Sequence, residues 1–395
     1  MTELAGFEGL QEQMVSWRRH LHRHPEVSFH ESRTAAFVAT HLQEWGIEVR
    51  EHVGGHGVIG IIRGDRPGPV VMLRADMDAL PIQDEKDCEY RSTVDGAMHA
   101  CGHDGHTAML LGTARYFAQH RHKLAGEIRC LFQPAEELLP GGALQIIKDG
   151  ALDGVDAIYG IHLWTPLSKG TVASCAGAMM AAADDFYIDI HGKGGHGGMP
   201  QHTNDTVIAG AALVMQLQSI VSRSIDPLQP GVLTIGTIHG GAAQNVIAER
   251  CQLSGTVRTF DERTRALMKE RLHSLTEQIT AAYNTKAEIK YIMGYPPVVN
   301  NKEEAARFFH EATSIFGAEQ VQETPKIMPA EDFAYYLQQL PGCFMFVGAG
   351  NPDKGASFPH HHPKFDFDED VMLSGVRLFI AMATSFAREY IHKHE

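Results

Sequence analysis

Short apolar stretches that end in acidic or histidine residues recur through the first half of the chain, and a helical pattern usually follows each one. Three of these stretches are residues 69–78, 126–137 and 156–162. Strands that alternate with helices are typical of a layered α/β sheet, which binds ligands at the carboxyl ends of its strands. The polar residues at these strand ends are Asp76, Asp78, Glu136, Glu137 and His162. We therefore expect a functional site where they meet.

A different pattern begins near residue 182. Strand and helix patterns follow one another in the order β-α-β-β-α-β, and Pro296 and Pro297 end the last strand. This order is that of a split βαβ unit of the ferredoxin-like type. We expect residues 182–296 to fold as a small α+β domain.

The histidine-rich segment 360–370 decides how the remaining chain is divided. If it joins the earlier clusters, the main domain is discontinuous and comprises residues 1–181 and 297–395, with residues 182–296 inserted. The alternative is two consecutive domains followed by a tail.

Charge and composition argue against several kinds of partner. The net charge of −14 disfavours nucleic acid and an anionic membrane surface. No apolar run approaches the roughly 18 residues of a membrane span, and the first residues lack the features of a signal peptide. The six cysteines are scattered without a CxxC pair, so we expect reduced thiols and a cytoplasmic protein.

The segment MHACGHDGH, residues 98–106, places one cysteine, Cys101, among three histidines. Structural zinc sites prefer several cysteines, whereas mixed cysteine, histidine and carboxylate ligands suit a catalytic site or a two-metal site. Paired metals need a bridging anion, and Cys101 is well placed to supply one, with His103 two residues on. The alternatives are a cysteine nucleophile with a histidine base and a buried structural cysteine.

The adjacent pair Glu136–Glu137 is the second strong signal. Neighbouring residues at a strand end point in different directions, so one carboxylate can bind a metal while the other acts as a general base. The alternative is two solvated glutamates at the start of a helix. His162 is either a ligand or a hydrogen-bonded core histidine.

Eight motifs occur in the order seen in one known family. They are RADMDALP, HACGHDGH, FQPAEE, GIHLW, GKGGHGGMP, QNVIAE, PAEDFAYY and HHPKFDFDED. Over nearly the whole chain the protein resembles the amidohydrolase branch of the two-metal aminoacylase/carboxypeptidase family. The resemblance implies an α/β fold, a layered catalytic domain with a mixed sheet, interrupted by an inserted ferredoxin-like α+β lid or dimerisation domain. It also implies two divalent metal ions per subunit, Zn, Mn or Co.

The resemblance implies roles for residues of the catalytic domain. The implied metal ligands are Cys101, as the bridge, with His103, Glu137, His162 and His361. His361 is chosen because it lies two positions before the proline of HHHP, which leaves His360 and His362 without a role. Glu136 would be the general base. Asp76 and Asp78 would hold ligand histidines in one tautomer.

In the inserted domain the resemblance implies three further residues. His196 would reach an active site, often that of the partner subunit, and stabilise the oxyanion; the alternative is a loop histidine of no special role. Asn245 and Arg258 would hold the free carboxylate of the substrate, Arg258 through paired hydrogen bonds.

The implied reaction is hydrolysis of a small-molecule N-acyl-L-amino acid of the N-acetyl or N-benzoyl type. The implied assembly is a homodimer or homotetramer formed through the lid. The nearest alternative function is a dipeptidase or metallocarboxypeptidase with the same two-metal chemistry. A non-catalytic metal-binding protein is the alternative from another class.

Overall fold

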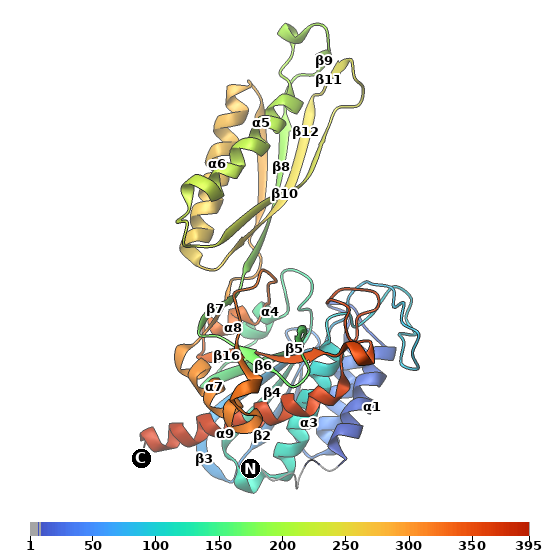
Figure 1. Ribbon diagram of the computed structural model, residues 1–395, viewed down its shortest axis with the longest axis vertical. Coiled ribbons are helices and arrows are strands. Elements are labelled where there is room, and N and C mark those ends of the chain that lie inside the picture. The colour runs from blue at the N-terminus through green and yellow to red at the C-terminus, as the bar shows by residue number, and fades with distance from the viewer. Residues whose placement is uncertain (1–6, 8, 395) are drawn as a thin grey trace. The chain divides into compact units, whose positions relative to one another are not determined.

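The computed structural model describes residues 7 and 9–394, and the chain divides into two compact units (Figure 1). The first unit contains the chain up to Gly177, together with Val299–Pro325 and the chain from Asp332 onward. The second contains Ala178–Val298 and Lys326–Glu331.

The short segment Lys326–Glu331 belongs to the second unit because of its backbone pairing. The Ile327 N–H donates to the Met179 carbonyl at 3.0 Å, and the Ala181 N–H donates to the Ile327 carbonyl at 3.1 Å. The insertion expected from the sequence, residues 182–296, does not include this segment, since its pairing joins residues about 150 positions apart.

An eight-stranded mixed sheet forms the centre of the first unit, in the order β1-β2-β4-β3-β5-β16-β6-β15. The strands are β1 (Glu48–Val53), β2 (Gly57–Arg63), β3 (Arg66–Asp76), β4 (Ala125–Gln133), β5 (Ala157–Ser168), β6 (Val172–Ser174), β15 (Val321–Glu323) and β16 (Gly342–Gly350). The central neighbours β4, β3, β5 and β16 are parallel, so their carboxyl ends lie at one edge of the sheet.

Helices pack on this sheet or on one another. They are α1 (Leu10–Arg23), α2 (Ser32–Glu44), α3 (His103–Gln119), α4 (Ala143–Lys148), α7 (Lys302–Phe316), α8 (Ala334–Leu337) and α9 (Met372–His394). In α1 the apolar residues Leu10, Met14, Trp17 and Leu21, spaced four, three and four positions apart on one side of the helix, are buried. Every residue of β16 is also buried, which explains why its sequence is apolar throughout rather than alternating.

The second unit has a four-stranded antiparallel sheet in the order β10-β12-β8-β13. Its elements are β8 (Ala182–His191), α5 (Thr206–Ser219), β10 (Gly231–Gly240), β12 (Arg250–Thr259), α6 (Glu262–Ala282) and β13 (Lys286–Ile292). The chain order β-α-β-β-α-β with this strand order is the ferredoxin-like arrangement. A two-stranded ribbon of β9 (Gly195–His196) and β11 (Val246–Ile247) follows β8. Strands β7 (Gly177–Met180) and β14 (Val298–Asn300) lie where the chain crosses between the units.

The predicted fold class is therefore confirmed: a layered α/β domain with a mixed sheet is interrupted by an inserted ferredoxin-like α+β domain. The sequence led us to expect no segment of membrane-spanning length, but two helical segments, Thr206–Ser224 and Glu369–His394, are long and on average apolar enough to cross a membrane, by length and composition alone. The second is mostly buried, as expected for a core helix. The first is only one-third buried.

Candidate metal centre

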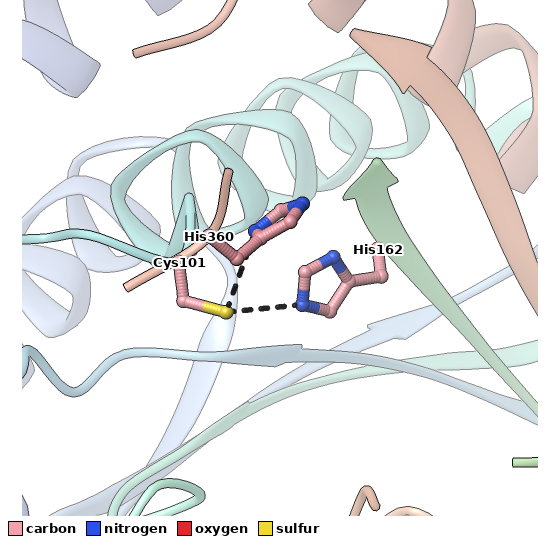
Figure 2. A group of neighbouring side chains, drawn as sticks. All are labelled: Cys101, His162 and His360. Carbon is pink, nitrogen blue, oxygen red and sulfur yellow. Dashed lines mark hydrogen bonds between the residues drawn. The ribbon is translucent and has the colours of Figure 1, made fainter. Parts of the chain in front are cut away.

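Cys101 lies in the first unit within reach of two histidines from distant parts of the chain (Figure 2). Its Sγ lies 3.4 Å from Nε2 of His162 and 3.7 Å from Nδ1 of His360. His162 lies in the middle of β5, which continues to Ser168 and does not end at His162 as the sequence suggested. The candidate ligand atoms of these three residues lie within 4.8 Å of one another. They could therefore hold one metal ion.

A second group of three shares Cys101. It contains Cys101, His103 and Glu137, again with one candidate ligand atom from each residue within 4.8 Å of the others. Two adjoining groups with one common thiol are the arrangement that a bridged pair of metal ions requires.

The donor atoms of the second group fit a cation. Nε2 of His103 and Oε1 of Glu137 are buried and 3.8 Å apart, and neither makes a hydrogen bond within the described part of the chain, although Nε2 of His361 lies 3.2 Å from the Glu137 oxygen. Buried polar atoms are nearly always paired. Nδ1 of His103 contacts the Asp78 carbonyl at 2.9 Å and Oδ1 of Asp78 at 3.3 Å. If Nδ1 carries the proton, Nε2 presents its lone pair to the site.

The backbone of the Glu136–Glu137 segment is fixed by the same aspartate. The Glu137 N–H donates to Oδ2 of Asp78 at 2.9 Å. Glu136 is buried and follows the end of β4, where a base beside the two metal groups is expected. Asp78 therefore orients one candidate ligand, His103, and the main chain of another, Glu137.

Asp76 contacts a histidine that was not predicted to have a role. Its Oδ1 lies 2.6 Å from Nδ1 of His106, and Nε2 of His106 accepts the Leu163 N–H at 2.8 Å. Both ring nitrogens of His106 are therefore engaged, so it supports the backbone next to His162 rather than serving as a free ligand. Asp76 also accepts from Arg74 at 2.7 Å.

The buried acids of the cluster favour a positive charge beside them. Although burial opposes ionisation, the neighbouring acids Asp76 and Asp78 raise the pKa of His103 to about 10. Burial lowers the pKa of His162, and it lowers that of His360 to about 3, so both are neutral imidazoles as metal ligation requires.

The thiol of Cys101 is less acidic than a nucleophilic cysteine requires. Burial, followed by the carboxylates of Glu137 and Glu136, raises its pKa well above the usual range in the protein alone. Nucleophilic cysteines need a lowered pKa. A divalent cation would reverse the effect and give a thiolate ligand. The metal role is therefore favoured over the cysteine nucleophile.

The predicted ligand His361 lies beside this cluster in a different position from His360. Its Nε2 is 3.2 Å from Oε1 of Glu137, its side chain is 52% exposed, and its backbone is left-handed with φ 66°. His360, to which the sequence assigned no role, instead joins Cys101 and His162. The signal that could have suggested it is the run of three adjacent histidines. The ligand role of His361 stays a prediction.

His196 and Asn245 of the second unit lie together on the β9–β11 ribbon. His196 is exposed and pairs with Val246, the residue after Asn245, while the Gly197 N–H donates to the Asn245 carbonyl at 2.8 Å. Nδ1 of His196 accepts the Gly198 N–H at 3.0 Å, which leaves Nε2 as the protonated nitrogen of the neutral ring.

Arg258 lies at the other end of the same unit. It is half-buried on β12 opposite Ala183, and its guanidinium donates to Thr256 Oγ1 and to the Val257 carbonyl. The end of β8 nearest the ribbon, His191, is eight residues from Ala183, or about 25 Å along the strand. Within one unit, Arg258 and His196 therefore do not meet.

Comparison with known proteins agrees with this cluster. The model of peptidase family M20/M25/M40 matches residues 72–385. The chain belongs to this family. It is therefore a metal-dependent hydrolase that acts on amides, and its two adjoining ligand groups fit the two metal ions of the family.

Individual relatives differ in the activity that they are named for. An N-acyl-L-amino acid amidohydrolase of Geobacillus stearothermophilus is 49% identical over 290 residues, 73% of this chain and 78% of that protein. Thermostable carboxypeptidase 1 of Saccharolobus solfataricus is 40% identical over 383 residues, 96% of this chain and 97% of that protein. A Bacillus subtilis structure described as a dinuclear metal-binding peptidase of the M20 family has TM-score 0.84 and 34% identity, covering 96% of this chain and 99% of that one.

Proposed function

We propose that this protein hydrolyses the amide bond of N-acyl-L-amino acids of the N-acetyl or N-benzoyl type and releases a carboxylic acid and a free amino acid. The observation that carries the proposal is the pair of ligand groups sharing Cys101, with the buried Glu136 in the segment that supplies Glu137. The similarity to a relative named as an N-acyl-L-amino acid amidohydrolase supports this substrate class. The carboxypeptidase relative keeps peptide hydrolysis as the alternative.

In the proposed reaction Glu136 handles the proton. Two divalent ions would lower the pKa of water and polarise the amide carbonyl, and Zn, Mn and Co all suit the mixed S, N and O donors. Glu136 takes a proton from the attacking water and then delivers it to the leaving nitrogen. His196 donates from Nε2 to the oxyanion, and Asn245 and Arg258 hold the carboxylate of the amino acid.

The length of β8 in the second unit, which we call the lid, limits which active site His196 can serve. His196 follows the His191 end of β8, whereas Arg258 pairs with Ala183 near the other end, about 25 Å away along that strand. This is more than an N-acyl amino acid spans. If both residues contact one substrate, they must come from two lids, so we propose that His196 and Asn245 serve the active site of the partner subunit.

We propose that the lid forms the dimer contact through α5 and the neighbouring edge strand β10. Ile208 and Met215 lie two turns apart on α5 and are 52% and 74% exposed. Ile238 of β10 is also exposed, and among the described strands β10 pairs on one side only, with β12. An apolar surface beside an open strand edge is suited to a second copy of the chain. A tetramer would need a further contact.

Mixing two inactive variants tests this arrangement. His196→Ala and Glu136→Gln should each be nearly inactive, whereas an equal mixture that exchanges subunits should recover about a quarter of wild-type activity, because half of the dimers are mixed and each has one intact site. Turnover after mixing is the measurement. Adding Met215→Glu to both variants should abolish the recovery and give a monomer in sedimentation. Absence of recovery without Met215→Glu would show that His196 does not act across subunits.

The substrate class is tested by removing and returning the metal. Protein stripped with a chelator should release no amino acid, and added Zn, Mn or Co should restore release from N-acetyl-L-methionine or hippurate, measured with ninhydrin. A Met-Ala dipeptide is the control substrate. Cleavage of the dipeptide alone would favour the peptidase alternative, and activity that survives chelation would contradict the metal-dependent mechanism.

We also propose a cytoplasmic location. All six cysteines are free, as a reducing compartment requires. Cell fractionation measures this directly, and recovery of the protein in a membrane or secreted fraction would contradict it.

A further inference from the structure

Two residues with left-handed backbone conformation lie next to each other in space beside the Glu136–Glu137 pair. The angle φ is 68° at Phe29 and 54° at Ala135, values that non-glycine residues seldom adopt. Such conformations persist only where the surroundings impose them. Ala135 precedes Glu136 directly, so its backbone sets the direction in which Glu136 leaves the main chain.

A single carboxylate oxygen holds both residues. Oε1 of Glu31 accepts the Ala135 N–H at 2.8 Å and the Phe29 N–H at 3.0 Å. Glu31 lies just before α2, more than 100 residues from Ala135 in the chain. The bond is therefore a tertiary contact between the loop before α2 and the loop that carries the proposed base.

Glu31 is buried at an energetic cost. Its exposed fraction is 0%, and Oε2 has no hydrogen-bond partner among residues 7 and 9–394. Burial, with a smaller contribution from Asp78, raises the pKa of Glu31 to about 7. Burying an ionisable group is unfavourable unless its contacts compensate. The contacts that Oε1 makes are the two backbone N–H groups.

The main chain of Glu137 is linked to the loop before α2 through a different carboxylate, that of Asp78. Oδ2 of Asp78 accepts both the Glu137 N–H and, at 2.7 Å, the hydroxyl of Ser28. Loss of the Glu31 bond would therefore leave the main chain of the metal ligand Glu137 attached through Asp78. The residue most affected would be Glu136.

We propose that Glu31 is a positioning residue for Glu136: by holding the Ala135 N–H it fixes the left-handed backbone that aims the Glu136 carboxylate. This role rests on the proposed function of Glu136 as the general base. The role requires an acceptor oxygen on a side chain as long as that of glutamate, so that it can reach the Ala135 N–H. It does not require the negative charge of the carboxylate.

Three substitutions of Glu31 distinguish the effect of side-chain length from the effect of its negative charge. Glu31→Gln keeps the reach and an acceptor oxygen, and should retain kcat within about threefold. Glu31→Asp keeps the charge but is shorter by one methylene, and should lower kcat at least about tenfold, because misplacement of a reacting group by about 1 Å costs up to about 100-fold. Glu31→Ala should be at least as low as Glu31→Asp. KM and the two metals per chain should change little in all three.

Glu26→Asp is the matched control. Glu26 lies in the same loop and its carboxylate accepts from Arg33 Nε, Thr34 N–H and Thr34 Oγ1, all within that loop and α2. Its shortening should loosen the loop without releasing Ala135, so kcat should stay within about threefold of the wild type. A loss equal to that of Glu31→Asp would overturn the proposal, since general loosening would then explain both.

Hydrogen exchange supplies a measurement that does not depend on activity. The backbone amides of Ala135 and Glu136 should exchange faster in Glu31→Asp than in the wild type, and at the wild-type rate in Glu31→Gln and Glu26→Asp. Unchanged exchange in Glu31→Asp, wild-type kcat in Glu31→Asp, or a Glu31→Gln variant as slow as Glu31→Asp would each overturn the proposal. If the wild type cleaves no acyl amino acid, the proposed function fails, while exchange still tests whether Glu31 holds Ala135.

Discussion

Replacing Glu136 with Gln should lower kcat by about 1,000-fold or more while both metal ions stay bound, because general acid–base catalysis alone contributes about 100- to 10,000-fold. The amide of the substituted side chain would match the carboxylate in size but could neither take the proton from water nor deliver it to the leaving nitrogen. Steady-state turnover and metal analysis of the same preparation are the two measurements.

Glu137→Gln is the matched control for this prediction. Oε1 of Glu137 belongs to a ligand group and has no hydrogen-bond partner among the described residues. Glu137→Gln should therefore lower metal content, whereas Glu136→Gln should not. Wild-type turnover in Glu136→Gln, or equal loss of metal in both variants, would contradict the division of roles between these adjacent carboxylates.

Cys101→Ala should weaken the binding of both metals by more than about 100-fold and abolish turnover. The reason is that Cys101 belongs to both ligand groups, and even residues that only support a ligand contribute about 10- to 100-fold to metal affinity. Metal content after dialysis and competition with a chelator measure the effect. Two metals bound at wild-type affinity would contradict the bridging role.

Cys130→Ala provides the control for loss of a buried thiol. Cys130 is fully buried on β4, and burial raises its pKa, but it belongs to neither ligand group. We expect it to lose some stability and to keep both metals.

His360→Ala and His361→Ala, measured in the same way, distinguish the two adjacent histidines. His360 lies with Cys101 and His162, so its loss should lower the affinity for one metal. His361→Ala should have the larger effect if metal binding draws His361 into the site beside Glu137, as the family resemblance predicts.

Much of the architecture could be predicted from the sequence because it depends on local periodicity. The spacing of Leu10, Met14, Trp17 and Leu21 in the sequence is that of one side of a helix, which α1 confirms, and the strand–helix order after residue 182 predicted the ferredoxin-like unit. The polar residues predicted at strand ends were expected to meet because parallel strands place their carboxyl ends together. Asp76 does end β3 and the Glu136–Glu137 pair follows β4, whereas His162 lies within β5.

The sequence by itself thus determined the fold class, the strand ends that form the site, and the residue types that can bind metal. Only the tertiary structure decided which of several neighbouring side chains joins a ligand group or supports a ligand. His360 and His361 are adjacent and chemically identical, and left-handed backbone at His361 separates their directions. Glu31 and Ala135, or Asp76 and His106, meet through contacts between distant segments. Local patterns record the periodicity of a helix or strand, but the direction of a loop side chain depends on backbone angles that distant partners impose.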